Sequence, residues 1–212
     1  MIALVLLGVL IQPPPAEKWE KEIAAIEARH KADPPPPGGV VFAGSSTIRL
    51  WDLKASFPGK GYINVGFGGS QIPDATKYAP RIILPLKPKA IVFYSADNDL
   101  NAKRTPEQVR DDFRAFAKVI RDALPTTPIL IIGVKPSVKR WEQYPIQAKA
   151  NGYLKAMHET DKRIHFLDTA PLILGSDGKP RPELFEKDGL HLNAEGYKPV
   201  AAGVAKWLEA QR

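Results

Sequence analysis

Short apolar runs alternate along the chain with longer segments in which hydrophobic residues recur every three or four positions. The run at 90–94 (AIVFY) is apolar throughout, which is typical of a central parallel strand that is covered on both faces. The other runs are equally short and are bounded by glycine, proline or polar residues, as strands usually are. The predicted strands lie at 40–43, 62–65, 90–94, 129–134 and 164–167.

The segments between these runs have the spacing of amphipathic helices. Within 106–124, Val109 and Phe113 lie on one face, and Thr105 before Pro106 is a favourable helix start. The predicted helices span 16–32, 73–84, 106–124, 147–161 and 194–211. Strands that alternate with helices favour a doubly wound fold, so we predict a three-layer α/β/α sandwich around a central, mainly parallel sheet.

The composition is that of an ordinary globular protein. Of the 212 residues, 44% are hydrophobic and 25% are charged, and this length suits one α/β domain, which we place at 16–212. The 30 Lys and Arg against 23 Asp and Glu give a net charge of +7, but the basic residues are scattered among acidic ones. We therefore expect no nucleic-acid partner. The absence of cysteine from the sequence excludes disulfides, a thiolate nucleophile and a cysteine-ligated zinc ion.

The first eleven residues are almost wholly apolar and precede prolines at 13–15. They are too few to cross a bilayer as a helix, so no stable membrane span is expected. They resemble the hydrophobic part of a secretory signal, although no basic residue precedes them and no small-x-small cleavage site follows. We interpret 1–15 as a signal or anchor remnant and favour an exported, periplasmic or secreted protein over a cytoplasmic one. A genuine N-terminal strand is the alternative.

Candidate functional residues follow the predicted strands. Ser46, Gly69 and Asn98 each come a few residues after one of them. Functional groups in parallel α/β sheets gather at the edge where the carboxyl ends of the strands meet. Each residue also has a purely structural explanation: Ser46 suits a helix N-cap, Gly69 a tight turn and Asn98 an Asx turn. Taken singly, none of the three positions establishes a site.

A further polar pair, Asp188 and His191, precedes the last predicted helix. An Asp three residues before a His can hold the imidazole through its Nδ1 proton, which leaves Nε2 to take a proton from a serine. This arrangement is typical of the catalytic triad of a serine hydrolase, with Ser46 as the serine. Because a protonated imidazole cannot act as a base, we expect activity to fall on acidification.

Four segments resemble the sequence blocks of the SGNH (GDSL-type) hydrolase family of esterases and lipases. They are 44–46 (GSS), 64–69 (NVGFGG), 96–99 (ADND) and 188–191 (DGLH), in the family's order. The resemblance implies the flavodoxin-like SGNH hydrolase fold, with Ser46 as nucleophile, His191 as general base and Asp188 as its orienting partner. It also implies an oxyanion hole built from the backbone N–H groups of Ser46 and Gly69 and the side-chain amide of Asn98.

Two positions depart from the family pattern. Ser45 stands where the family usually has Asp, which removes a carboxylate that could brace the nucleophile turn. Ala96 replaces the usual Gly of the Asn block, which narrows the accessible backbone conformations. We expect its methyl group to reduce the acyl space or to shift the loop. Neither change affects a proton-transfer group or an oxyanion donor, so activity is still predicted.

The resemblance leads us to expect cleavage of carboxylic esters, with short acyl or acetyl groups on small molecules or carbohydrate, through an acyl-serine intermediate and without metal or cofactor. An exported enzyme would suit an acetylated glycan, whereas a cytoplasmic one would suit thioester or lysophospholipid cleavage. Another alternative is a non-catalytic glycan-binding module, because a fold alone does not establish chemistry. No nucleotide cofactor is expected, since Gly66, Gly68 and Gly69 do not fit G-x-G-x-x-G.

Overall fold

The computed structural model describes residues 18–211, which contain a five-stranded sheet in the order β2-β1-β3-β4-β5. The strands are β1 (Val40–Gly44), β2 (Ile63–Asn64), β3 (Ala90–Tyr94), β4 (Ile129–Ile132) and β5 (Ile164–Leu167). Each neighbouring pair is parallel. This confirms the predicted parallel sheet, and the strand order is the flavodoxin-like one.

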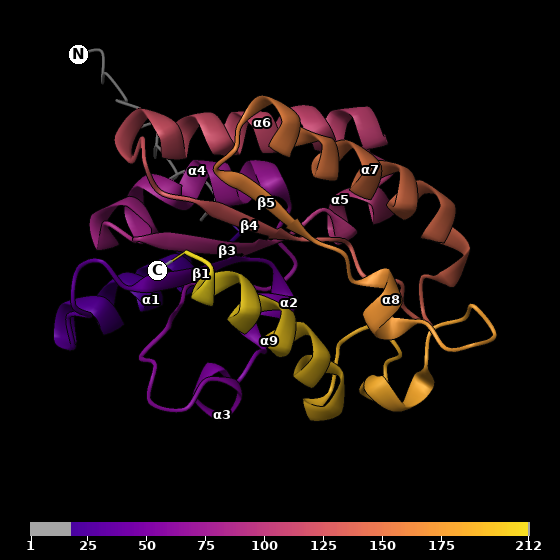
Figure 1. Cartoon of the computed structure of the whole chain (residues 1–212). Helices are drawn as coiled ribbons and strands as arrows, with labels where there is room; N and C mark the ends of the chain where they lie inside the picture. Colours follow the sequence, from indigo (N-terminus) through magenta and orange to yellow (C-terminus); the bar gives the residue numbers. More distant parts are fainter. Residues whose placement is uncertain (1–17, 212) are drawn as a thin grey trace, which may run out of the picture.

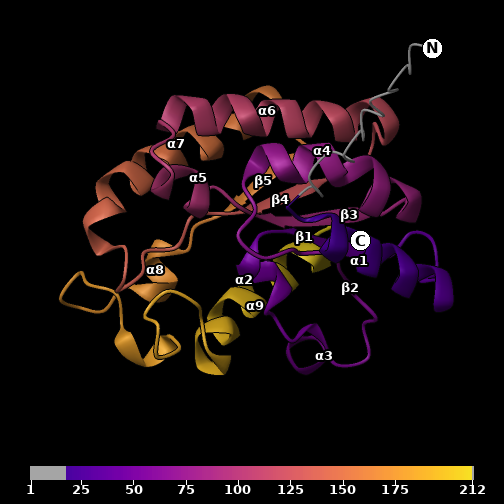
Figure 2. The same cartoon turned by 180° about the vertical axis from the view of Figure 1, so that it is seen from behind.

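Helices cover both faces of the sheet, as Figures 1 and 2 show. One face carries α1 (Glu20–Ala32), α4 (Ile72–Ile82), α6 (Pro106–Ala123) and α7 (Tyr144–Thr160). The other carries α2 (Ser46–Arg49), α3 (Leu53–Ser56), α8 (Ala170–Ile173) and α9 (Ala194–Glu209). The remaining helical segments are α5 (Asp97–Asn101), η1 (Leu84–Leu86), η2 (Trp141–Gln143) and η3 (Pro182–Leu184). The predicted three-layer sandwich is thus confirmed.

Two hydrophobic clusters occupy the spaces between the layers. In β1, Val41 and Ala43 belong to the cluster under α1 and α4, whereas Val40 and Phe42 belong to the one under α9. This alternation follows from the two-residue period of a strand. Because both faces are covered, the central strands are apolar throughout, which is why they could be recognised in the sequence.

Several element boundaries differ from the prediction. Helix α1 begins at Glu20 and not at residue 16, and β2 is reduced to two residues at the sheet edge. Helix α7 begins at Tyr144 and not at the predicted residue 147. Pro145 thus lies in the first helical turn, where a proline is tolerated. The predicted start of α6 is confirmed, since the Thr105 hydroxyl accepts a hydrogen bond from the Gln108 N–H.

The predicted signal or anchor at 1–15 lies outside the described residues. Within 18–211, no helix combines the length and apolar character needed to span a membrane.

Gly44 ends β1 where the chain turns toward the candidate site. Its φ is +129°, and a Cβ atom there would lie 1.9 Å from the Tyr94 carbonyl oxygen. That same oxygen accepts a hydrogen bond from the Ser45 N–H at 3.0 Å. Only glycine permits this close approach of β1 to β3, so the start of the Ser46 turn is fixed by backbone sterics.

Candidate active site

Ser46 is the first residue of α2, directly beyond the carboxyl end of β1. The N-cap of this helix is Ser45, which makes no side-chain capping hydrogen bond. The alternative interpretation of Ser46 as an N-cap is therefore wrong. Its backbone N–H lies in the first helical turn, where N–H groups have no partner within the helix and favour negative charge.

The three residues expected to form a triad lie in hydrogen-bonded sequence. His191 Nε2 is 2.9 Å from Ser46 Oγ, and His191 Nδ1 is 2.5 Å from Asp188 Oδ2. The other Asp188 oxygen accepts hydrogen bonds from the N–H groups of Leu190 and His191, at 2.8 and 3.0 Å. Burial alone would raise the pKa of the Asp188 carboxyl, but these N–H groups and the His191 ring hold it well below its usual value. The carboxylate is thus available to orient the imidazole.

The start of α9 holds the loop that carries His191. Asn193 caps the helix by accepting a hydrogen bond from the Gly196 N–H, and its amide nitrogen donates to the carbonyl oxygens of Glu183 and Phe185. The Glu186 N–H donates to the His191 carbonyl oxygen at 2.8 Å. These bonds fix both ends of the loop, so the ring position does not depend on the Ser46 contact alone.

The glycine loop after β2 presents the Gly69 backbone. Gly69 has a φ of +72° and is exposed, and its N–H donates no hydrogen bond to any described residue. Helix α1 holds the preceding peptide, because Trp19 Nε1 donates to the Gly68 carbonyl oxygen at 2.8 Å and the Gly68 N–H donates to Glu22 Oε2 at 3.0 Å. Sequence reasoning did not connect either residue with the site, because Trp19 falls on the apolar face of the predicted helix and Glu22 on its polar face.

Asn98 lies on the one-turn helix α5 beyond β3, and not in the Asx turn considered as its alternative. Its Nδ2 donates to the Ser70 carbonyl oxygen at 3.0 Å. The hydroxyl of Ser70 has one hydrogen, which it shares between the carbonyl oxygens of Phe67 and Gly44, at 3.0 and 3.4 Å. Fully buried Ser70 therefore joins the nucleophile turn, the glycine loop and helix α5 at one place. Sequence analysis did not single out this serine, because only tertiary contacts reveal it.

The two departures from the family pattern have different outcomes. Ala96 has a φ of +79°, a left-handed conformation that costs a non-glycine residue about 1–2 kcal/mol. Its side chain lies in the core cluster beneath α4 and α6, so the expected intrusion of the methyl group into the acyl space is wrong. At Ser45, support comes from the backbone, whose carbonyl oxygen accepts from the Ile48 and Arg49 N–H groups.

Asp99, next to Asn98, is fully buried with one oxygen accepting from the Ile72 N–H and the other unpaired. Burial raises the pKa of this carboxyl to about 6, despite the opposing Ile72 hydrogen bond. Because the folded state holds the proton more tightly than the unfolded chain, ionisation of Asp99 destabilises the fold as the pH rises from about 4 to about 6. Asp99→Asn should remove this effect. The unfolding free energy of the variant minus that of the parent should therefore increase by up to about 3 kcal/mol between pH 4 and a pH above 6.

Urea unfolding followed by circular dichroism at pH 4 and pH 7 checks this expectation. Asp122→Asn is the control, because Asp122 is exposed and ion-paired with Lys118. A stability difference between Asp99→Asn and the parent that stays constant with pH would contradict the assignment of this titration to Asp99.

With this geometry established, the comparisons with known proteins define the family. The model of the GDSL-like lipase/acylhydrolase family matches residues 45–198, most of the chain. The chain belongs to this family. The matched range contains all five residues expected to form the site. No curated protein sequence matches the chain significantly.

Solved structures share the GDSL fold at low sequence identity. A GDSL-like lipase from Bacteroides thetaiotaomicron is 20% identical, with a TM-score of 0.76 over 90% of this chain and 98% of that one. A Bacteroides fragilis protein described as an acylhydrolase is 21% identical, with a TM-score of 0.77 over 95% and 100%. The C-terminal catalytic domain of Streptococcus pneumoniae peptidoglycan O-acetyltransferase A is 20% identical, with a TM-score of 0.61 over 83% and 95%. These likenesses establish the fold.

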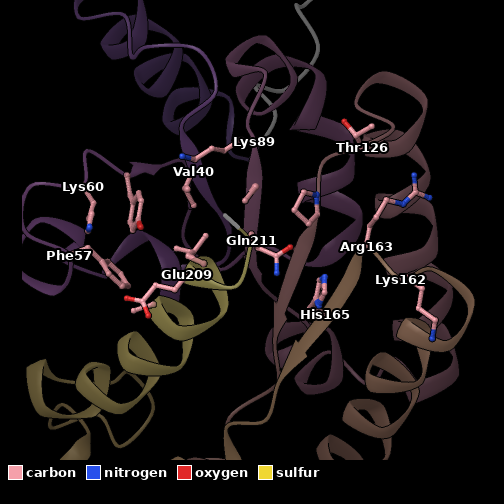
Figure 3. A pocket seen from close by; sticks show the side chains of 15 residues that line it. Val40, Phe57, Lys60, Lys89, Thr126, Lys162, Arg163, His165, Glu209 and Gln211 are labelled. Carbon is pink, nitrogen blue, oxygen red and sulfur yellow. The ribbon is translucent and has the colours of Figure 1, made fainter.

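A cavity of about 560 Å³ lies at the opposite end of this GDSL fold, beside the amino ends of β1, β3 and β5 (Figure 3). Val40 and Ala90 contribute to its wall, together with Glu209, the last residue of α9, and Gln211, which follows that helix. None of the five residues expected to form the site lines it. The candidate site is instead at the carboxyl edge, as the strand-end rule predicts.

Proposed function

We propose that this chain hydrolyses carboxylic esters through an acyl intermediate on Ser46. The observation that carries the proposal is the continuous hydrogen-bond path from Asp188 Oδ2 through both ring nitrogens of His191 to Ser46 Oγ. Membership of the GDSL-like lipase/acylhydrolase family supports the same class of reaction. A serine capping a helix needs no imidazole at its hydroxyl, so a proton-transfer role explains the contact better than a structural one.

The first half of the reaction forms the acyl-enzyme. His191 Nε2 takes the hydroxyl proton as Ser46 Oγ attacks the ester carbonyl carbon, and Asp188 stabilises the resulting imidazolium through Nδ1. The tetrahedral intermediate collapses as the imidazolium gives its proton to the leaving alcohol. In the second half His191 deprotonates a water molecule that attacks the acyl carbon, and the acid leaves while Ser46 recovers its proton.

The oxyanion that forms in both halves requires hydrogen-bond donors. We assign this role to the backbone N–H groups of Ser46 and Gly69 and to Asn98 Nδ2. The Gly69 N–H has no partner among the described residues, and the Asn98 amide has a second hydrogen beyond the one given to Ser70. Donors that are fixed before the reaction stabilise the developing charge without reorganisation.

Asn98→Ala is expected to lower kcat by about 100- to 1000-fold, because it removes one donor from the oxyanion. Steady-state kinetics on a p-nitrophenyl ester measures the loss. Asn101→Ala is the matched control: Asn101 lies on the same short helix but is exposed and accepts from Gln143 Nε2. Equal rates for Asn98→Ala and the parent would remove Asn98 from the proposed oxyanion hole.

The experiment that tests the proposed function is hydrolysis of p-nitrophenyl acetate, butyrate and octanoate by the purified protein. We expect fastest turnover of the short esters, since short-chain acyl or acetyl esters form part of the proposal. A folded protein that releases no p-nitrophenol from any of the three would contradict ester hydrolysis and leave the glycan-binding module as the better account. A clear preference for octanoate would favour the lysophospholipase alternative over acetyl esters.

A further inference from the structure

A lysine is buried behind the candidate site, and the proposed reaction does not use it. Lys135 follows β4 and is only 1% exposed. Its Nζ lies 3.2 Å from Tyr94 Oη and 3.5 Å from both Asp97 Oδ2 and Thr47 Oγ1. An ammonium group out of water costs several kcal/mol unless an anion compensates it. Burial holds the pKa of Lys135 below its ordinary value, although Asp97 opposes the shift.

The compensating anion is Asp97, which joins two cations. One of its oxygens faces Lys135, and the other accepts from Arg140 Nη1 at 2.7 Å. The two terminal nitrogens of Arg140 each lie 3.4 Å from Asn98 Oδ1. Lys135 and Asp97 are buried, whereas the side chain of Arg140 is 13% exposed. These ion pairs connect Thr47, the residue after Ser46, with the side chain of Asn98.

The contacts of Arg140 bear on the orientation of the Asn98 amide. With Oδ1 toward the guanidinium, Nδ2 faces the Ser70 carbonyl oxygen and donates to it at 3.0 Å. Turning the amide over would set Oδ1 against the Ser70 oxygen and the NH₂ group against a cation, and both contacts would be repulsive. In the observed orientation one amide hydrogen stays free beside the hydrogen given to Ser70. That hydrogen is the one the proposed oxyanion hole requires.

We propose that Arg140, held by Asp97 and Lys135, is a positioning residue that fixes the Asn98 amide for oxyanion binding. The inference rests on the proposed function for its catalytic consequence, but the orientation of the amide is a property of the free protein. Arg140 acts through Asn98 and does not itself meet the reacting atoms. Lys135 has the supporting role of keeping Asp97, and hence Arg140, in place.

The kinetic test is a double-mutant cycle on a p-nitrophenyl ester. Arg140→Gln is expected to lower kcat about 10- to 100-fold, with little change in KM, because a displaced donor costs rate rather than binding. In the Asn98→Ala background the same substitution should lower kcat by less than about threefold, since the group it positions is gone. Equal losses in both backgrounds would overturn the proposal.

Arg121→Gln is the matched control. Arg121 pairs with Asp161 at 2.8 Å, and its side chain is 14% exposed against 13% for Arg140. This ion pair joins the end of α6 to the segment before β5, at the far edge of the sheet from Ser46. We expect Arg121→Gln to match Arg140→Gln in loss of stability and to leave kcat unchanged. A similar fall in kcat for both variants would reduce the Arg140 effect to general destabilisation and contradict the proposal.

A second measurement needs no substrate. The order parameter of the Asn98 side-chain amide, assigned by its loss in Asn98→Ala, is measured by ¹⁵N relaxation in the parent and in Arg140→Gln. We expect it to fall in Arg140→Gln and to stay unchanged in Arg121→Gln. An amide equally ordered with and without Arg140 would overturn the positioning role. A parent that cleaves no ester would contradict the proposed function, while this measurement would still decide the role of Arg140.

Discussion

Ser46→Ala is expected to lower kcat by on the order of 10⁴- to 10⁶-fold, because it removes the atom that forms the acyl bond. The residual rate would come from the oxyanion donors and from substrate binding. Fold loss does not explain such an effect, since alanine fits the first turn of α2 and, among residues 18–211, the hydroxyl hydrogen-bonds with His191 Nε2 alone. Steady-state hydrolysis of p-nitrophenyl acetate, with folding checked by circular dichroism, measures it.

Ser56→Ala is the control for this substitution. Ser56 is also half-buried, and its hydroxyl also contacts a ring nitrogen, accepting from Trp51 Nε1 at 2.8 Å. Its loss should leave kcat within about twofold of the parent, because exposed or half-buried polar substitutions away from a site rarely alter more than local stability. A Ser46→Ala variant as active as Ser56→Ala would show that the nucleophile lies elsewhere.

Asp188→Asn is expected to lower kcat by about 10³- to 10⁴-fold with little change in fold. The amide can still accept from the Leu190 and His191 N–H groups, but it can donate a hydrogen to Nδ1 and so favour the tautomer that carries its proton on Nε2. That tautomer cannot take the Ser46 proton. The substitution also removes the charge that stabilises the imidazolium.

Asp177→Asn provides the matched comparison for Asp188. Asp177 accepts from the N–H two residues later, as Asp188 does, but its carboxylate meets no histidine. We expect Asp177→Asn to retain the parent's kcat in the same assay. If Asp188→Asn also kept full activity, His191 would not depend on this carboxylate for its tautomer, and the proposed proton path would be wrong at that step.

Much of the fold could be predicted because its signals are local. The strands of a sheet covered on both faces are continuous apolar runs, and the helices carry one apolar stripe. The errors fall where tertiary contacts decide. The one-turn helices α2 and α5 are too short to have a period of their own, and β2 is shortened at the sheet edge, where one partner strand pairs with it.

Five candidate residues could be named from the sequence because they lie in recognisable segments, and the structure brings three of them, Ser46, His191 and Asp188, into hydrogen-bond contact. The oxyanion roles of Gly69 and Asn98 stay predictions. The groups that hold the five residues could not be named from the sequence. Lys135 lies just after the predicted strand, in a segment (135–140) with two lysines and an arginine, and nothing local distinguishes this buried lysine from exposed Lys139. Burial of Lys135 follows from the meeting of β3, β4 and α2, which only the three-dimensional structure reveals.

The most direct test of acyl transfer through Ser46 is covalent capture of the nucleophile. The purified protein is treated with a fluorophosphonate, and the adduct is located by intact mass and peptide mapping. Our account predicts one adduct on Ser46, loss of esterase activity in proportion to labelling, and no adduct in Ser46→Ala. An active protein that stays unlabelled, or that carries the adduct on another residue, would contradict it.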